Sequence, residues 1–147
     1  MDRIDKEERI IGYITLLSNK LSQFGDSLLP DITFKQWFLL IMIAKMEKKE
    51  KNLNSIAEFV GTSRQNIKKM LISLENKGYV QIIKSELDAR ALNVELTEKS
   101  YIYFNDNADN AARETNKLFE SFSIDEIENL IADLEKLIYS LSQYGNK

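Results

Sequence analysis

Residues Gly61–Val80 read GTSRQNIKKMLISLENKGYV, and this stretch decides the fold of the 147-residue chain. It contains four apolar residues at the spacing i, i+3, i+4 and i+7: Ile67, Met70, Leu71 and Leu74. That spacing predicts a helix with one buried face. Ser63 suits the N-cap of this helix, and Lys77 followed by Gly78 suits its end. The opposite face is polar and basic, and the role of this face can be inferred only together with the flanking segments.

The segments on either side predict a helix-turn-helix followed by a β-hairpin. Before the stretch, residues 54–60 predict a short helix, and Gly61–Thr62 turns the chain. After it, the apolar period changes from about 3.6 to about 2. Residues 79–84 and 92–97 therefore predict two strands, and residues 85–90 form the tip between them. This order of elements is that of a winged helix-turn-helix.

Longer helices are predicted outside this central part. Residues Ile4–Phe24 carry a helical apolar stripe, and residues 34–46 predict a buried central helix that opens with a capping box of Thr33 and Gln36. Beyond the hairpin, one helix is predicted over 97–120, and the last helix opens with a second capping box, Ser123 and Glu126. The predicted fold is mainly α, with helices, a two-stranded β-wing and additional N- and C-terminal helices.

The composition excludes several classes of site. Cysteine and histidine are absent, so disulfides, thiol redox switches, Cys/His zinc sites and His-based catalytic triads are excluded. The sequence shows no nucleophile–base pair and no phosphate-binding glycine loop, so we expect no enzyme, no cofactor and no metal. No apolar run approaches the roughly 18 residues of a membrane span, and the N-terminus does not read as a signal peptide. We therefore expect a cytoplasmic protein without a membrane partner.

Three motifs together resemble a known family. LNSIAEFVGTSRQNIKKMLISLENKGYV (53–80), LDAR (87–90) and ALNVELTEKS (91–100) are similar to the core of MarR-type (multiple-antibiotic-resistance regulator) transcription factors. The resemblance covers residues 33–100, and the flanking helices fit in number and length. One position departs from the family, which often has two adjacent arginines after the wing aspartate. Here Ala89 stands in place of the first of them, while Asp88 and Arg90 are kept.

The resemblance implies an organisation and a set of partners. It implies one domain over 1–147, with the winged helix-turn-helix DNA-binding part over 33–97 and dimerisation helices over 3–25 and 105–144. It further implies an obligate homodimer on double-stranded DNA, with a helix in each major groove and a wing arginine in each minor groove. A small-molecule effector commonly controls affinity in such proteins. The alternative for the apolar stripes of the terminal helices is packing within one chain.

The charge distribution supports a nucleic-acid partner. The chain is acidic overall, with a net charge of -3. Residues Lys45–Arg90 nevertheless carry ten Lys or Arg and six Asp or Glu, a net charge of +4, whereas the rest of the chain has ten basic and seventeen acidic residues. Basic residues concentrated on one segment supply sequence-independent affinity for phosphate. Taken alone they would indicate a solvated helix face, but the turn and wing around them favour contact with DNA.

Nine residues are candidates for that contact: Ser63, Arg64, Gln65, Asn66, Lys68, Lys69, Lys84, Asp88 and Arg90. Gln and Asn can bond adenine bidentately, and Arg or Lys suits guanine. Ser63 is expected to cap its helix first and to touch phosphate second. For Arg64, a phosphate contact and a base contact are equally expected. Asp88 is expected to steady Arg90.

The expected function is that of a sequence-specific DNA-binding transcriptional regulator, in the form of a ligand-responsive homodimeric repressor on an inverted-repeat operator. The alternative is a winged-helix protein-interaction module whose basic face binds an acidic protein. Tyr13, Trp37 and Phe38 lie where the resemblance places an effector pocket. Aromatic residues at helical spacing more often belong to a core. The alternative is therefore that these three side chains are core residues and do not line a pocket.

Overall fold

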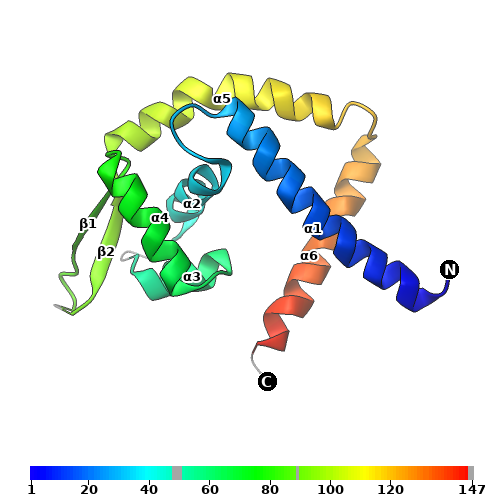
Figure 1. Cartoon of the computed structure of the whole chain (residues 1–147), viewed down its shortest axis with the longest axis horizontal. Coiled ribbons are helices and arrows are strands. Elements are labelled where there is room, and N and C mark those ends of the chain that lie inside the picture. Colours follow the sequence, from blue (N-terminus) through cyan, green and yellow to red (C-terminus); the bar gives the residue numbers. More distant parts are fainter. Residues whose placement is uncertain (48–50, 89, 146–147) are drawn as a thin grey trace. The chain divides into compact units, whose positions relative to one another are not determined.

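The computed structural model describes residues 1–47, 51–88 and 90–145 (Figure 1). Two compact units are present, Met1–Ala108 and Asp109–Lys147. Lys48, Lys49 and Glu50, which contribute to the charge count, and Ala89, the departure from the family pattern, lie outside the described residues. The elements are α1 (Arg3–Leu28), α2 (Phe34–Lys45), α3 (Leu53–Val60), α4 (Arg64–Asn76), β1 (Val80–Lys84), β2 (Leu92–Leu96), α5 (Glu98–Leu118) and α6 (Ile124–Tyr144).

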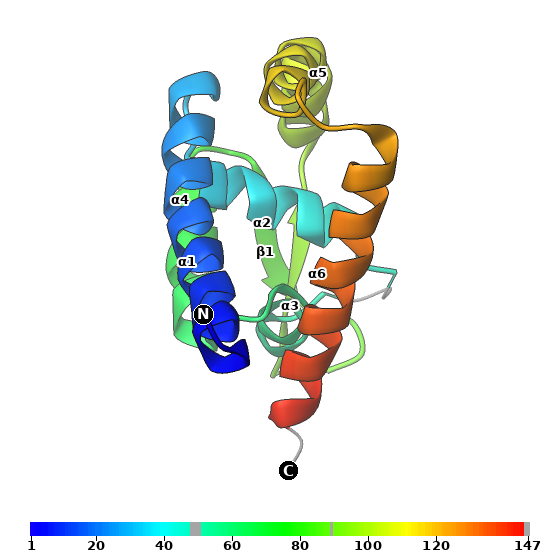
Figure 2. The ribbon, with the colours of Figure 1, turned by 90° about the vertical axis from the view of Figure 1, so that its right-hand side faces the viewer.

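The buried core lies within the first unit. Helix α2 packs against α1, α3 and β2, and Figure 2 shows it among these elements. The expectation that α2 is the central helix is confirmed, because one side of it is fully buried. From α4, the predicted apolar face enters the same core, although Met70 is only partly buried. The fully buried apolar side chains are Leu39, Leu40, Ile43, Ile56, Ile67, Leu71, Leu74, Val80 and Val94.

The predicted hairpin is confirmed. Strands β1 and β2 are antiparallel, with Val80 opposite Leu96 and Lys84 opposite Leu92. Lys51 extends the pairing at the edge of β2, since its carbonyl oxygen accepts a hydrogen bond of 2.8 Å from the Val94 amide. The Lys51 amide in turn donates to Oδ1 of Asn93 at 2.5 Å. The wing is thereby joined to the segment that precedes α3.

The predicted helix starts are also confirmed. At α2, Oγ1 of Thr33 accepts from the Gln36 amide at 3.1 Å, and the Gln36 side chain accepts from the Thr33 amide, which is a complete capping box. Ser123 and Glu126 form the same reciprocal pair at the start of α6. At α4, Oγ of Ser63 accepts from the Asn66 amide at 3.2 Å.

The end of α1 differs from the sequence expectation. Gly25, Asp26 and Ser27 are turn-forming residues, so together with the apolar stripe of Ile4–Phe24 they predict a helix that ends at Phe24. It continues to Leu28, because Oγ of Ser27 bonds the Phe24 carbonyl within the helix and Gly25 is buried against α2. A Cβ atom at Gly25 would lie 2.2 Å from the Phe34 ring. This glycine therefore serves close packing of the two helices rather than chain reversal.

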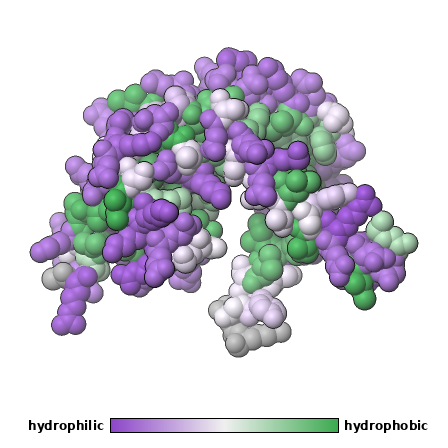
Figure 3. Space-filling model, viewed as in Figure 1, coloured by the Kyte–Doolittle hydropathy of each residue, from purple (hydrophilic) through white to green (hydrophobic). Residues whose placement is uncertain are grey.

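The terminal helices keep their apolar residues at the surface. On α1, Ile10, Ile11 and Leu17 are each more than half exposed. Helix α6 has no buried residue, and Ile131 and Ile138 are 51% and 62% exposed. Figure 3 shows apolar surface on α6. Among the described residues of each of the two units, no other element covers these stripes.

Candidate nucleic-acid interface

The turn between α3 and α4 fixes where the second helix begins. Gly61 ends α3 with φ 81°, a left-handed conformation that suits glycine. Its amide donates to the Ala57 carbonyl at 2.9 Å, and the Thr62 amide donates to the same carbonyl at 3.1 Å. Both bonds fix the backbone of the turn, and the turn thereby fixes the position at which α4 begins.

The N-terminal turns of α4 present the polar candidates to solvent. Arg64, Gln65, Lys68 and Lys69 are exposed. Ser63 caps the helix, as expected. The side-chain amide of Asn66 donates to Oγ1 of Thr62 at 3.1 Å, which orients that side chain before any partner binds. Thr62 is not among the candidates from the sequence, because only the folded turn brings its hydroxyl to Asn66.

The basic side chains of this surface form no ion pair with the acidic side chains that the structure describes. Among the described residues, no ion pair involves Arg64, Lys68, Lys69, Lys84 or Arg90. Elsewhere in the described part of the chain, three cations do form ion pairs: Arg3 with Glu7 at 2.6 Å, Lys77 with Asp31 and Lys117 with Glu114. Unpaired cations on one surface are available to phosphate without first giving up an intramolecular partner.

The tip of the wing is shaped by two side chains. Oγ of the buried Ser85 accepts from the amides of Leu87 and Asp88, both at 3.1 Å. Oδ1 of Asp88 accepts from the Arg90 amide at 2.9 Å. Asp88 thus holds the backbone of Arg90, whereas its carboxylate makes no ion pair with the guanidinium. The Arg90 side chain stays free to reach outward.

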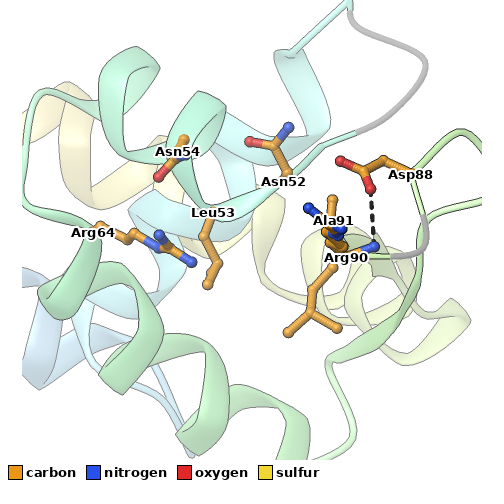
Figure 4. Close-up of a pocket in the computed structure, with 8 residues that line it drawn as sticks. Asn52, Leu53, Asn54, Arg64, Asp88, Arg90 and Ala91 are labelled. Carbon is orange, nitrogen blue, oxygen red and sulfur yellow. Dashed lines mark hydrogen bonds between the residues drawn. The ribbon is translucent and has the colours of Figure 1, made fainter.

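Helices and wing surround one open hollow of about 310 Å³ (Figure 4). Arg64 approaches it from the start of α4, and Asp88 and Arg90 approach it from the wing. Asn52 and Asn54, at the start of α3, complete the rim. These two asparagines were not predicted as site residues, although the N-cap role of Asn52 could have been read from Ser55 three residues later. The hollow joins the two predicted DNA-contacting parts.

Lys84 lies apart from the hollow, at the exposed end of β1. It faces Leu92 across the hairpin. Lys84 is exposed on the wing. Among the described residues, it forms no hydrogen bond or ion pair with the polar candidates of α4.

The three aromatic candidates for an effector pocket have different surroundings. Tyr13 is half exposed on α1, where its hydroxyl accepts from Nε of Arg9 at 2.6 Å. Trp37 packs on the core and stacks with Phe34 at 5.7 Å between ring centroids. Phe38 is 40% exposed. No ring contact joins the three within the described part of the chain, and of the three only Trp37 packs against the core.

The described residues form neither an acidic metal site nor a membrane-spanning helix. Within residues 1–47, 51–88 and 90–145, no group of three or more acidic side chains could hold a metal ion. None of the helices formed by these residues combines the length and apolar character that crossing a bilayer requires.

Comparison with known proteins identifies the fold. A MarR/EmrR family transcriptional regulator from Acinetobacter sp. ADP1 superposes with a TM-score of 0.78 at 21% identity, covering 93% of this chain and 97% of that one. A MarR mutant from E. coli in complex with operator DNA gives 0.80 at 19% identity, covering 93% and 99%. S. aureus MepR in complex with DNA gives 0.73 at 22% identity, covering 88% and 94%. No protein-family model and no curated protein matches the sequence. The winged-helix fold of MarR-type regulators, expected from the motifs, is confirmed.

Proposed function

We propose that this chain, which has the fold of MarR-type regulators, is a sequence-specific DNA-binding transcriptional regulator. One observation carries the proposal. Arg64, at the start of α4, and Arg90, on the wing, line one open hollow, and neither forms an ion pair with a described residue. The exposed side chains of Gln65, Asn66, Lys68 and Lys69 follow Arg64 along α4. Two solved proteins of this fold are described as complexes with DNA, and one of them holds operator DNA. Both the local chemistry and the fold therefore favour the same partner.

The proposed division of labour follows from the side chains. Gln65 and Asn66 read base edges in the major groove, because amides match the donor and acceptor pattern of adenine. Lys68, Lys69 and Lys84 contact phosphates, and Arg64 contacts phosphate from the rim of the hollow. Phosphate contacts fix the register of the protein, whereas base contacts select the sequence. Arg90 enters the minor groove from the wing, where arginine suits a narrow, electronegative groove.

We further propose that the protein acts as a homodimer on an inverted repeat. The exposed apolar residues of α1 and α6 support this, since a soluble chain rarely leaves such wide apolar faces uncovered. Two copies would present two α4 helices about one DNA turn (~34 Å) apart. Removal of Phe122–Lys147 should therefore leave a poorly soluble or unfolded chain rather than a stable monomer, because the apolar face of α1 would stay uncovered. Sedimentation and circular dichroism would show this, and a full-length chain that sediments as a well-folded monomer at micromolar concentration contradicts dimerisation.

Ligand response, repression and cytoplasmic location are proposed on the family resemblance. A small ligand that binds the DNA-free conformation more tightly would release the protein from its operator. Tyr13 and Phe38 are the exposed aromatic residues of the predicted ligand set. A ligand screen by thermal shift, with Phe38→Ala as the test variant, would show whether this part of the chain contributes to binding.

The decisive experiment is a binding titration of the full-length protein on genomic fragments, followed by salt titrations on the preferred site and on scrambled DNA. We expect a preferred site and a linear fall of log affinity with log salt concentration. Lys69→Ala should reduce the salt slope by about 0.9 on both DNAs, because one phosphate contact is lost. Lys20→Ala, which removes an exposed cation of α1, is the matched control and should leave the slope unchanged. Absence of binding to any fragment would contradict the proposal and favour the protein-interaction module.

A further inference from the structure

The linker between α1 and α2 is held by side chains from distant parts of the chain. Tyr79, at the end of the α4–β1 turn, donates its hydroxyl to Oδ2 of Asp31 at 2.5 Å. Lys77, the C-cap of α4, donates its ammonium to the Asp31 carbonyl. From α5, Tyr103 donates its hydroxyl to the Pro30 carbonyl at 2.8 Å. We call these five residues (Pro30, Asp31, Lys77, Tyr79 and Tyr103) the linker clamp.

The backbone of the linker is adapted to this contact. Asp31 has φ 68° and is the one residue other than glycine with a positive φ among the residues described. An aspartate tolerates the left-handed region better than most side chains do, but the conformation still stores strain. The surrounding bonds must hold it. Strain of this kind concentrates where a precise geometry serves function.

The clamp is charge-assisted and stays so at neutral pH. The hydrogen bond from Tyr79 lowers the pKa of Asp31 below its usual value, with Lys77 and Lys99 acting in the same direction. Burial, followed by the hydrogen bond to Asp31, raises the pKa of Tyr79. Burial also raises the pKa of Tyr103 to about 12. The Asp31 carboxylate is therefore ionised, and the hydroxyls of Tyr79 and Tyr103 are protonated. The negative charge strengthens the hydrogen bond that Tyr79 donates to Asp31.

Further bonds make the linker a rigid joint between three helices. Oδ1 of Asp26, in the last turn of α1, accepts from the Phe34 amide at the start of α2 at 2.7 Å. Nε2 of Gln36, in the first turn of α2, donates to Oγ of Ser73 in α4 at 3.0 Å. Together with the clamp, these bonds tie the end of α1 and the start of α2 to the C-terminal half of α4.

We propose that the linker clamp sets the direction of α4 relative to α1 and thereby the half-site spacing that the dimer accepts, with Tyr79 and Asp31 as positioning residues. The inference rests on the proposed DNA-binding function and on dimerisation through α1. Helix α4 has 13 residues and spans about 20 Å. A tilt of about 10° at its clamped end would shift its reading end by roughly 3.4 Å, one base-pair step along a strand. A small loosening of the clamp is therefore enough to change which spacing fits.

The test compares spacing preference with half-site affinity. Full-length protein and variants are titrated on the selected inverted repeat, on repeats with one base pair added or removed between the half-sites, and on a single half-site. Tyr79→Phe removes the hydroxyl and keeps the buried ring, which contacts Tyr103 edge-on at 5.5 Å between centroids. We expect it to reduce discrimination between spacings by roughly three- to tenfold, the scale at which mutations alter coupling between sites. Half-site affinity should change by less than about twofold.

The matched control is Tyr101→Phe, which makes the same chemical change on exposed α5. The Tyr101 hydroxyl makes no hydrogen bond to any described residue, so this variant should keep the wild-type discrimination. Asp31→Asn is the second variant of the clamp, because asparagine keeps the shape of the side chain and tolerates the positive φ. It should reduce discrimination in the same direction, and it serves if Tyr79→Phe proves unfolded.

Three results would overturn the inference while the proposed function stands. In the first, the clamp variants retain the wild-type discrimination between spacings. In the second, they lose affinity equally for the half-site and for every repeat, which is the result expected if the clamp only stabilises the fold. A wild-type protein that binds its site but accepts all spacings equally would also overturn it. Failure of the wild type to bind any DNA is a different outcome, and it contradicts the proposed function itself.

Discussion

Asp88 at the tip of the wing offers a test in which two physical effects oppose each other. Its carboxylate accepts a hydrogen bond from the Arg90 amide at 2.9 Å, which orders the turn that carries the arginine. The same carboxylate is an exposed anion on a surface proposed to face phosphate. Asp88→Ala removes both the bond and the charge, whereas Asp88→Asn keeps an oxygen acceptor and removes only the charge.

The magnitudes decide which effect is larger. A hydrogen bond of this kind contributes about 0.5–1.5 kcal/mol, and without it the wing must be ordered when DNA binds. Repulsion of the anion by a phosphate about 10 Å away in water is roughly 0.4 kcal/mol, and salt screens it further. Loss of the bond therefore outweighs relief of the repulsion. We expect Asp88→Ala to weaken binding about two- to fivefold and Asp88→Asn to leave it unchanged or slightly tighter.

The assay is a titration on the preferred site at fixed low salt, with Glu86→Ala as the control. Glu86 is a second anion of the wing tip, and it makes no hydrogen bond or ion pair with the described residues, so its removal should only relieve repulsion. Binding that tightens equally in Asp88→Ala, Asp88→Asn and Glu86→Ala would refute the reasoning. Asp88 would then be an anion near DNA and not the residue that orders the wing.

Further predictions concern base reading, packing and pH. Gln65→Ala and Asn66→Ala should each cost about 1–3 kcal/mol on the preferred site and little on scrambled DNA, measured by parallel titrations; an unchanged preference in both would show that α4 does not read bases. Gly25→Ala should lower the free energy of unfolding by about 1–3 kcal/mol, because its Cβ would meet the neighbouring ring. Gly12→Ala, with open space around it, should instead raise that free energy in the same urea titrations. Above pH 10.0, the usual pKa of tyrosine, stability should fall as pH rises, because the raised pKa of Tyr79 keeps its proton in the folded chain while the unfolded chain loses it. Urea titrations between about pH 9 and about pH 11 should show a shallower fall for Tyr79→Phe; an identical fall would argue against this group as the cause.

Local structure could be predicted because its causes lie within a few residues. The apolar face of α4 follows from a spacing that repeats every three to four residues. The caps at Thr33 and Ser63 bond amides three residues further along, so the sequence shows both partners. The change to a period of two marked the hairpin in the same way. The MarR-like order of elements was therefore available from the sequence, together with the exposed polar face that the candidate site uses.

The bonds that join these elements were decided only by the tertiary structure. Asp31 is 48 residues from Tyr79, and Pro30 is 73 residues from Tyr103, so no periodic pattern relates them. The extension of α1 through Gly25 depends on Phe34, which the sequence shows only as the first residue of another helix. Among the described residues, the packing also decides which acidic side chains come within reach of the exposed cations of α4 and the wing. Sequence periodicity reports the faces of each element, whereas the distances between elements are set by how those faces pack.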